Sequence, residues 1–328
     1  MPPTRVIIDT DPGIDDALAL MLAFASPELS VEAITTVAGN VTIAQTARNA
    51  CLLLDVIHPH SRPPVAVGAA HPLSKPVCTA QDYHGEDGLG DLSHLTTEEG
   101  MPRYPEPQQL LAPQSASTLM AEFISAAPGE MVLICIGPLT NLAMAIQAAP
   151  TEIAKVKEII IMGGAIQVSG NVTPGAEFNL HTDPDAARLV FTSGLPITLV
   201  PLDVTQQVML TAELIDVVVR HIDSRVTQFV RDITERLFGV EQARTGCAAI
   251  PLHDPLAVGI VIDPSLVTRR PFHVEVELGD GPAQGMTIAD RRQIREEWKQ
   301  PPNLQVCTEV DAGRFIALFL ERICRPTG

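Results

Sequence analysis

Short apolar runs alternate with amphipathic helical patterns along the first part of the chain. The apolar runs are rich in Val and Ile, which favour strands, whereas the segments between them repeat their apolar positions with helical spacing. Alternating strands and helices imply parallel strands joined by right-handed crossovers. The predicted strands are 6–8, 31–37, 65–67, 131–136, 158–162 and 197–200, and the predicted helices are 15–25, 42–57, 115–126, 141–149 and one that begins near Asp183.

The pattern changes after the strand at 197–200. We expect a single α/β domain over residues 1–328, with a mostly parallel, Rossmann-like central sheet flanked by helices and an antiparallel extension near the C-terminus. Residues 69–114, rich in Pro, Gly, His and acidic residues, interrupt the pattern, and a loop of this length is usually functional or disordered. The later elements are predicted helices at 212–220, 226–238, 254–262 and 312–323, and predicted antiparallel strands at 272–278, 285–289 and 304–310.

Four carboxylates, those of Asp9, Asp11, Asp15 and Asp16, lie within eight residues where the first predicted strand meets the first predicted helix. Two like charges about 4 Å apart repel by about 4 kcal/mol at an effective dielectric near 20, so this group needs compensation. A bound cation would supply it. A favourable interaction with the helix dipole would account for Asp15 and Asp16 alone, since only these fall in the first helical turn.

Two other acidic motifs can be compared with this stretch. An EF-hand loop that starts at Asp9 requires Glu at its twelfth position, where the chain has Leu20. A Mg²⁺-dependent phosphatase of the haloacid dehalogenase type would use Asp9 as its nucleophile, but such enzymes usually carry Thr or Val where this chain has Gly13. The phosphatase stays an alternative.

Other predicted strands also end in polar residues. Because the carboxyl ends of parallel strands share one edge of the sheet, these side chains would form one oxygen-rich pocket. Oxygen ligands without Cys or His pairs favour Ca²⁺ or Mg²⁺, and a flexible set of carboxylates plus a carbonyl suits the about six to eight ligands of Ca²⁺. The polar residues concerned are Asp9, Asp11, Asp15, Asp16, Asn40, Thr140, Asn171, Glu177, Asn179, Asp203 and Asp254.

The formal net charge of −17 argues against nucleic acid and anionic membranes as partners, because both would repel the protein. The longest uninterrupted apolar run, 17–25, is far short of the ~20 residues that span a bilayer, and no signal segment is recognisable. The six cysteines are scattered without a C-x-x-C pair, which is typical of reduced core residues. We therefore expect a cytoplasmic protein.

Six motifs follow one another along the chain: DTDPGIDD at 9–16, TTVAGN at 35–40, GPLTN at 137–141, MGG at 162–164, AEFN at 176–179 and HDP at 253–255. Together they resemble the nucleoside hydrolase family, from Asp9 to at least Pro255. The further segments TARNA at 46–50 and LDVT at 202–205 are similar to its broad-specificity, inosine–uridine preferring type. The resemblance implies hydrolysis of the N-glycosidic bond of purine or pyrimidine ribonucleosides to free base and ribose, in purine or pyrimidine salvage. A non-catalytic nucleoside- or ribose-binding protein stays an alternative.

The resemblance also implies roles for the matching residues. Asp11, Asp16, Asp254 and the carbonyl of Thr140 would bind Ca²⁺, which also takes two ribose hydroxyls. Asp11 would be the general base for the attacking water, because Ca²⁺ is too weak an acid to ionise water by itself. Asp9 would support the metal ligands without binding the metal. The implied substrate contacts are Asp15, Asn40, Met162, Asn171, Glu177 and Asn179.

Breaking the C1′–N bond leaves an oxocarbenium-like sugar, whose positive charge an acidic pocket stabilises. The departing base needs a proton donor or a strong hydrogen bond. His253 and His84 are the candidates, since His can hold a proton near neutral pH, and a purely structural role is the alternative for each.

Aromatic residues that could stack on a base are scarce. The region 225–250, which borders the base in this family, offers Phe229 and Phe238 but no Tyr or Trp. The lone Trp298 lies in the antiparallel extension, where we expect it to pack rather than to stack on a purine. The resemblance further implies a homo-oligomer, either a dimer or a tetramer.

Overall fold

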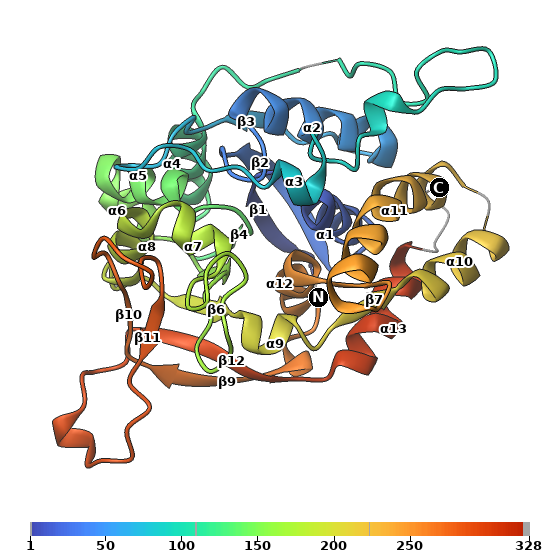
Figure 1. Cartoon of the computed structure of the whole chain (residues 1–328). Coiled ribbons are helices and arrows are strands. Elements are labelled where there is room, and N and C mark those ends of the chain that lie inside the picture. The colour runs from blue at the N-terminus through green and yellow to red at the C-terminus, as the bar shows by residue number, and fades with distance from the viewer. Residues whose placement is uncertain (1, 109, 223, 324–328) are drawn as a thin grey trace.

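An eight-stranded, mostly parallel sheet forms the centre of the structure (Figure 1). The computed structural model describes residues 2–108, 110–222 and 224–323. Neighbouring strands are parallel except for the last pair, which is antiparallel, so the predicted α/β class is confirmed. In spatial order the strands are β3 (Val65–Val67), β2 (Leu29–Thr36), β1 (Thr4–Thr10), β4 (Met131–Cys135), β5 (Glu158–Met162), β6 (Ile197–Val200), β12 (Leu304–Val310) and β9 (Val267–Phe272).

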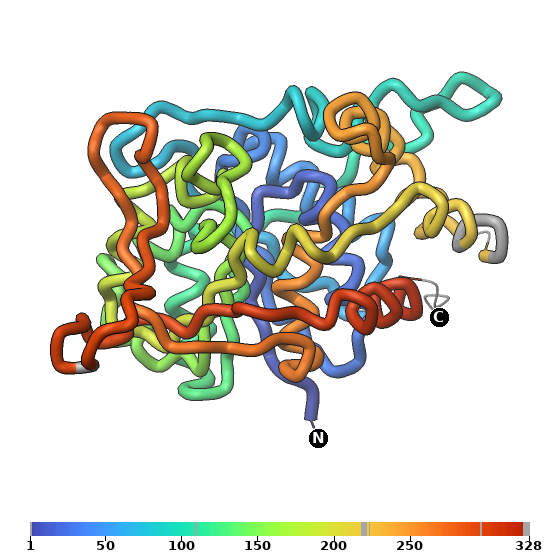
Figure 2. The backbone as a smooth tube through the Cα atoms, turned by 60° about the horizontal axis from the view of Figure 1, so that its bottom comes forward, coloured from blue at the N-terminus to red at the C-terminus, as the bar shows by residue number. Residues whose placement is uncertain are grey.

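Helices cover both faces of this sheet, because successive side chains of a strand point to opposite sides. Val6 and Ile8 of β1 belong to one hydrophobic core, and Ile7 belongs to the other. Figures 1 and 2 show the two helical layers on either side of the strands. The first layer contains α1 (Ile14–Phe24), α2 (Ile43–Ile57), α11 (Arg225–Thr245), α12 (His253–Ile262) and α13 (Ala312–Ile323), and the second contains α4 (Ala116–Ala126), α5 (Thr140–Ala148) and α8 (Pro184–Phe191).

The remaining elements lie mostly in the connections. Two antiparallel pairs are formed by β7 (Met209–Thr211) with β8 (Ala249–Pro251) and by β10 (Val274–Val276) with β11 (Thr287–Ala289). The other helices are α3 (Gln81–His84), α6 (Pro150–Ile153), α7 (Phe178–Thr182), α9 (Leu202–Thr205) and α10 (Ala212–His221), with 3₁₀ turns at Leu92–His94, Pro264–Leu266 and Glu296–Trp298.

The helix α12 brings two distant parts of the chain together. It is apolar over most of its length and packs against α1, α13 and β5. Gly259 allows the contact with α13, since a Cβ at this position would lie 2.2 Å from the ring of Phe315. The first turn of α12 thereby comes to lie beside the first turn of α1, where Asp254 approaches Asp15 and Asp16.

The antiparallel extension differs in detail from the prediction. The run predicted as one strand at 272–278 is divided at His273, because β9 ends at Phe272 on β12 while β10 begins at Val274 and pairs with β11. The helix predicted to end at 238 continues to Thr245. The β7–β8 pair was not predicted, since its strands have three residues each without a β-branched apolar run, and β8 ends in Pro251.

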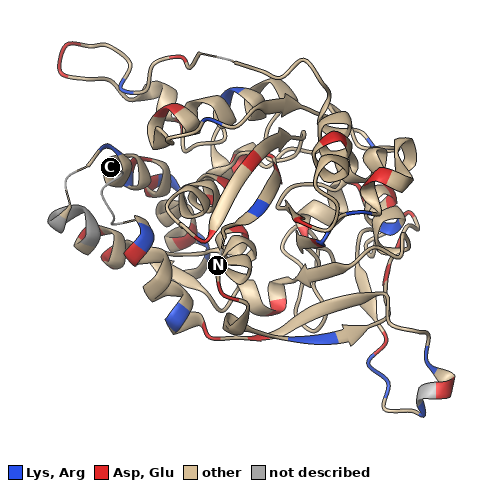
Figure 3. Cartoon of the chain, turned by 180° about the vertical axis from the view of Figure 1, so that it is seen from behind, with Lys and Arg blue, Asp and Glu red and all other residues tan. Residues whose placement is uncertain are grey.

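Three surface features also correct the sequence-based picture. Cys78 and Cys247 are exposed rather than part of the core, although every described cysteine is free. Trp298 does not pack into the extension, since it is 66% exposed and lies beside the guanidinium of Arg295. Acidic positions occur on many elements of the fold (Figure 3). Over the described residues, every helix is too short or too polar to cross a membrane.

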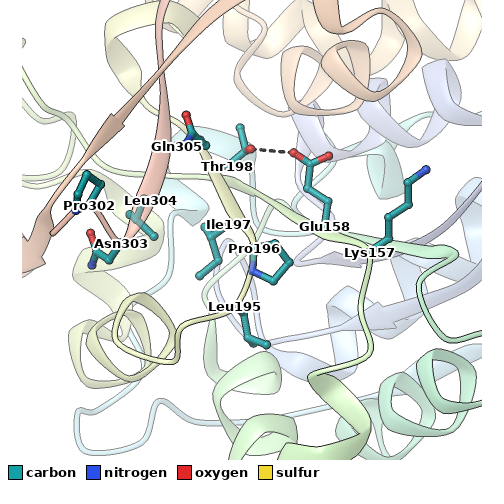
Figure 4. A pocket seen from close by; sticks show the side chains of 10 residues that line it. All are labelled: Lys157, Glu158, Leu195, Pro196, Ile197, Thr198, Pro302, Asn303, Leu304 and Gln305. Carbon is teal, nitrogen blue, oxygen red and sulfur yellow. Dashed lines mark hydrogen bonds between the residues drawn. The ribbon is translucent and has the colours of Figure 1, made fainter.

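A cavity of about 410 Å³ lies at the edge of the sheet where β5, β6 and β12 begin (Figure 4). In its wall, Glu158 accepts hydrogen bonds from the hydroxyl of Thr198 (2.8 Å) and from Nη1 of Arg269 (2.6 Å). Ligands of open α/β sheets bind at the opposite edge, where strands end. The predicted site residues lie at that opposite edge.

Candidate active site

Asp16 organises the acidic turn between β1 and α1. Its Oδ1 accepts hydrogen bonds from the hydroxyl of Thr10 (2.5 Å) and the amide of Asp11 (3.2 Å). Its Oδ2 accepts from the amide of Gly13 (3.0 Å) and from Nδ2 of Asn40 (3.0 Å). Each oxygen is therefore held by two donors, which fix the carboxylate within the turn.

Asp11 is held on one side only. Its Oδ2 accepts the backbone amide of Asn40 at 2.6 Å, whereas its buried Oδ1 has no hydrogen-bond partner within the described parts of the chain. Glycines allow the backbone to come this close, because a Cβ at Gly39 would lie 2.0 Å from Oδ2 and one at Gly137 would lie 2.6 Å from Oδ1. A buried carboxylate oxygen without a donor is an acceptor that a cation or a water molecule can use.

Asp15, Asp16 and Asp254 form the centre of the acidic group, with one oxygen of each lying within 4.8 Å of the others. Burial raises the pKa of Asp254 well above its usual range, and the neighbouring carboxylates, beginning with Asp15, add to the increase. Burial and Asp16 raise the pKa of Asp15 to about 7. A cation would reverse both effects, and carboxylates alone are the donor set of a hard divalent ion. The residues present therefore fit such an ion.

Thr140 is the first residue of α5, which follows the carboxyl end of β4. Its hydroxyl donates to Oδ2 of Asp183 at 2.6 Å, so the side chain is committed to that contact. Asp183 also accepts the amides of Leu73 (2.9 Å) and Ala186 (3.1 Å) and thereby caps α8. A ligand at Thr140 would have to use the backbone carbonyl, and this role stays a prediction.

Asp9 lies behind the turn and is fully buried. Its Oδ1 accepts from the hydroxyl of Thr35 (2.6 Å) and from Nδ2 of Asn141 (2.8 Å), which also donates to the carbonyl of Thr36 (2.9 Å). Burial raises the pKa of Asp9 to about 7. Asp9 thus connects the ends of β1 and β2 with the start of α5, which agrees with a supporting role.

Glu177 and Asn179 lie at the start of α7, at the end of the loop that follows β5. Glu177 caps α7, accepting the amides of Asn179 (2.9 Å) and Leu180 (3.3 Å) and, from the end of β5, the amide of Gly164 (3.0 Å). Nδ2 of Asn179 donates to the carbonyls of Ile136 (2.9 Å) and Met162 (3.3 Å). Glu177 is buried and contributes to the raised pKa of Asp254, so this loop faces the acidic group.

Asn171 is different from these residues, because it is exposed. Its Oδ1 accepts the amide of Phe178 at 3.0 Å. The antiparallel extension supports the same loop: the hydroxyl of Thr287 accepts the amide of Ala165 (2.9 Å) and donates to its carbonyl (2.6 Å). Met286 forms an isolated bridge with Ala176.

Both candidate histidines lie close to the acidic turn. Nδ1 of His84 accepts the backbone amide of Ile14 at 3.1 Å, so the proton of the neutral ring must be on Nε2. Nδ1 of His253 shares a hydrogen bond of 2.7 Å with the hydroxyl of Thr205. Burial lowers the pKa of His84 to about 3 and that of His253 to about 4, so both rings are neutral at pH 7.

Two residues that hold this site together were given no role in it from the sequence. Asn49 donates to the carbonyls of Pro12 (3.0 Å) and Asp87 (2.8 Å) and so ties the acidic turn to the segment after His84. Helical spacing alone assigns Asn49 to an ordinary helix interior. Asp183 resembled an ordinary helix cap, and its contact with Thr140 joins residues 43 positions apart, which no local pattern reveals.

The fold and the site define an α/β enzyme whose acidic, oxygen-rich centre lies at the carboxyl edge of a parallel sheet. A family model described as inosine-uridine preferring nucleoside hydrolase matches residues 6–317. The inosine-uridine preferring nucleoside hydrolase of Crithidia fasciculata is 36% identical over 324 residues, which cover 98% of each chain. The chain therefore belongs to the nucleoside hydrolase family, and the protein is a ribonucleoside hydrolase.

Two further comparisons agree with this assignment. The pyrimidine-specific ribonucleoside hydrolase RihA of Photobacterium profundum is 37% identical over 319 residues, covering 97% of this chain and 98% of that protein. Among solved structures, the plant nucleoside hydrolase PpNRh1 has a TM-score of 0.88 and 35% sequence identity, covering 99% of this chain and 100% of that chain. The Crithidia fasciculata and Photobacterium profundum enzymes are thus named for different bases, although they are almost equally similar to this chain.

Proposed function

We propose that the protein hydrolyses ribonucleosides with Ca²⁺ as its metal and Asp11 as its general base. Asp11, Asp16, Asp254 and the carbonyl of Thr140 would hold the ion. When bound, Ca²⁺ supplies positive charge that offsets the buried carboxylates and takes ribose hydroxyls. Ribose would be held by Asp15, Asn40, Met162, Asn171, Glu177 and Asn179.

The observation that carries this proposal is the unequal pairing of two neighbouring carboxylates. Asp16 accepts four hydrogen bonds, whereas Oδ1 of Asp11 accepts none from the described residues. Asp11 can therefore take a proton from water while its other oxygen stays fixed by Asn40. The oxygen of that water bonds to C1′ while the C1′–N bond breaks and its electron pair leaves with the base. The base takes up a proton from solvent and Asp11 returns its proton to solvent, so the products are ribose and the free base.

The histidines would assist departure of the base. His84 offers Nε2–H as a neutral donor, which can stabilise negative charge on the leaving nitrogen without a prior protonation. His253, next to Asp254, is the second candidate. The surrounding carboxylates stabilise positive charge on the sugar at the same time, so bond cleavage is favoured at both ends.

The proposed substrates are purine and pyrimidine ribonucleosides of the inosine–uridine type, in nucleoside salvage. Phe229 and Phe238 of α11 are both buried in the core, which supports a base-binding pocket in which α11 contributes no aromatic stacking. A cytoplasmic homo-oligomer, dimer or tetramer, completes the proposal, with residues 1–328 as one catalytic domain.

The Asp11→Asn variant tests the role of the base. Asparagine keeps an acceptor for the amide of Asn40 but cannot take a proton, so kcat on inosine and uridine should fall by at least about 10²-fold. Binding of ribose, measured by calorimetry at a Ca²⁺ concentration that fills the weakened site, should persist, because the amide oxygen of Asn can still ligate the ion and the other ribose contacts are unchanged. A kcat within threefold of the unmodified enzyme would refute the role of Asp11.

A further inference from the structure

One buried carboxylate near the site has no part in the chemistry proposed above. Glu241, on α11, is 2% exposed and accepts three hydrogen bonds. Its Oε1 accepts from the hydroxyl of Tyr83 (2.9 Å) and from Nη2 of Arg244 (2.7 Å), and its Oε2 accepts from Nε of Arg244 (3.3 Å). The charge is thus compensated within the helix, and the remaining contact reaches another segment, α3.

That contact lies next to the candidate leaving-group donor. The ring of Tyr83 packs edge-to-face on the ring of His84, with centroids 5.1 Å apart and planes at 84°. Burial and Glu241 raise the pKa of Tyr83 far above its usual range, so its phenol stays protonated and donates to Glu241. The imidazole of His84 is therefore held by the packing of the Tyr83 ring and by the hydrogen bond that its Nδ1 accepts from the amide of Ile14.

We propose that Tyr83 and Glu241 are positioning residues that hold His84 with Nε2–H directed at the departing base. This inference rests on the proposed role of His84 as leaving-group donor. Glu241 fixes the phenol, the ring of Tyr83 fixes the imidazole, and the amide of Ile14 selects the tautomer. The C-terminal half of α11 thereby sets the geometry of a donor that lies on a different segment.

The same helix carries a second cluster of matching composition. Asp232 accepts from the hydroxyl of Tyr104 (2.7 Å) and from Nη1 of Arg103 (2.9 Å). The ring of Tyr104 packs edge-to-face on Phe229, with centroids 5.1 Å apart and planes at 85°. This cluster joins α11 to the segment around Arg103, where none of the proposed catalytic or ribose-binding residues lies. It is an internal control for the loss of a tyrosine–carboxylate hydrogen bond.

The test compares Tyr83→Phe with Tyr104→Phe. Each change removes one phenol hydroxyl from a carboxylate on α11, which is buried for Glu241 and half-buried for Asp232, so both variants should lose some thermal stability. Activity is measured on uridine and on p-nitrophenyl β-ribofuranoside, whose leaving nitrophenolate needs no donor. For Tyr83→Phe we expect kcat on uridine to fall roughly tenfold, with less than a twofold change on the nitrophenyl riboside. Tyr104→Phe should be unchanged on both.

Glu241→Gln provides a second, independent variant. It removes the charge but leaves a carbonyl that can accept from Tyr83, so the selective loss on uridine should be smaller than in Tyr83→Phe. The double variant Tyr83→Phe/His84→Ala should be no slower on uridine than His84→Ala alone, because both changes remove the same function.

Three results would overturn the inference. If Tyr83→Phe lowers kcat equally on both substrates, the effect of Tyr83 lies in ribose or metal binding. If Tyr83→Phe and Tyr104→Phe lower kcat equally, the effect is one of general stability. If the losses of kcat add in the double variant, Tyr83 does not act through His84. His84→Ala itself tests the underlying function. If that variant shows no selective loss on uridine, the proposed role of His84 fails; if it does and Tyr83→Phe does not, only the positioning role fails.

Discussion

Removal of the metal should lower the thermal stability of the protein, because the carboxylates of the acidic group then repel one another. Oxygens of Asp15, Asp16 and Asp254 lie within 4.8 Å of one another, and two full charges at such a separation repel by at least about 3.5 kcal/mol at an effective dielectric near 20. An ion present at a hundred times its dissociation constant stabilises the folded state by about 2.7 kcal/mol. With an unfolding entropy of about 2.1 cal/mol/K per residue over 328 residues, this corresponds to about 4 °C in Tm.

The assay is a thermal melt of the protein after treatment with EDTA and dialysis, with Ca²⁺, Mg²⁺ or no divalent ion added at constant ionic strength. Asp254→Asn should reduce the Ca²⁺-dependent shift. The matched control is Asp87→Asn, since Asp87 is a buried carboxylate that accepts backbone amides of Leu89, Asp91 and Ser93 away from the acidic group. That variant should melt earlier yet keep the shift. Equal melting temperatures with and without Ca²⁺, after verified metal removal, would refute the reasoning.

Two further predictions concern residues around this centre. Gly39→Ala should lower both kcat and Ca²⁺ affinity by at least about tenfold, since its Cβ would lie 2.0 Å from Oδ2 of Asp11. The control is Gly239→Ala in α11, whose Cβ would meet no atom within 4 Å; this variant should leave kcat and Ca²⁺ affinity unchanged and raise the stability by up to about 1 kcal/mol. Thr287→Val should raise KM more than it lowers kcat, because it removes both hydrogen bonds to Ala165. Thr287→Ser, which keeps the hydroxyl, should have the normal KM. An unchanged KM in the valine variant would contradict this prediction.

The local pattern of apolar and polar residues predicted most of the fold and the position of the acidic group. Continuous apolar runs form the centre of the parallel sheet, at 6–8 in β1, 131–135 in β4 and 159–162 in β5, as expected for strands buried on both faces, and polar residues follow in the loops after them. The parts that were missed depend on distant contacts. The hydroxyl of Thr287 reaches Ala165 across 122 residues, and Tyr83 reaches Glu241 across 158. Neither pairing leaves a periodic signal in the sequence near either residue.

The proposed division of roles among the four clustered aspartates also depends on backbone direction. Asp11 and Asp16 are chemically equivalent in the sequence, and each is fully buried. In the turn, two backbone amides point at Asp16, whereas the backbone gives Asp11 one amide, that of Asn40. Because glycines at 39 and 137 let main chain rather than side chains surround Asp11, its Oδ1 stays without a donor. The turn thereby fixes one carboxylate completely and leaves its neighbour with an oxygen free to accept a proton.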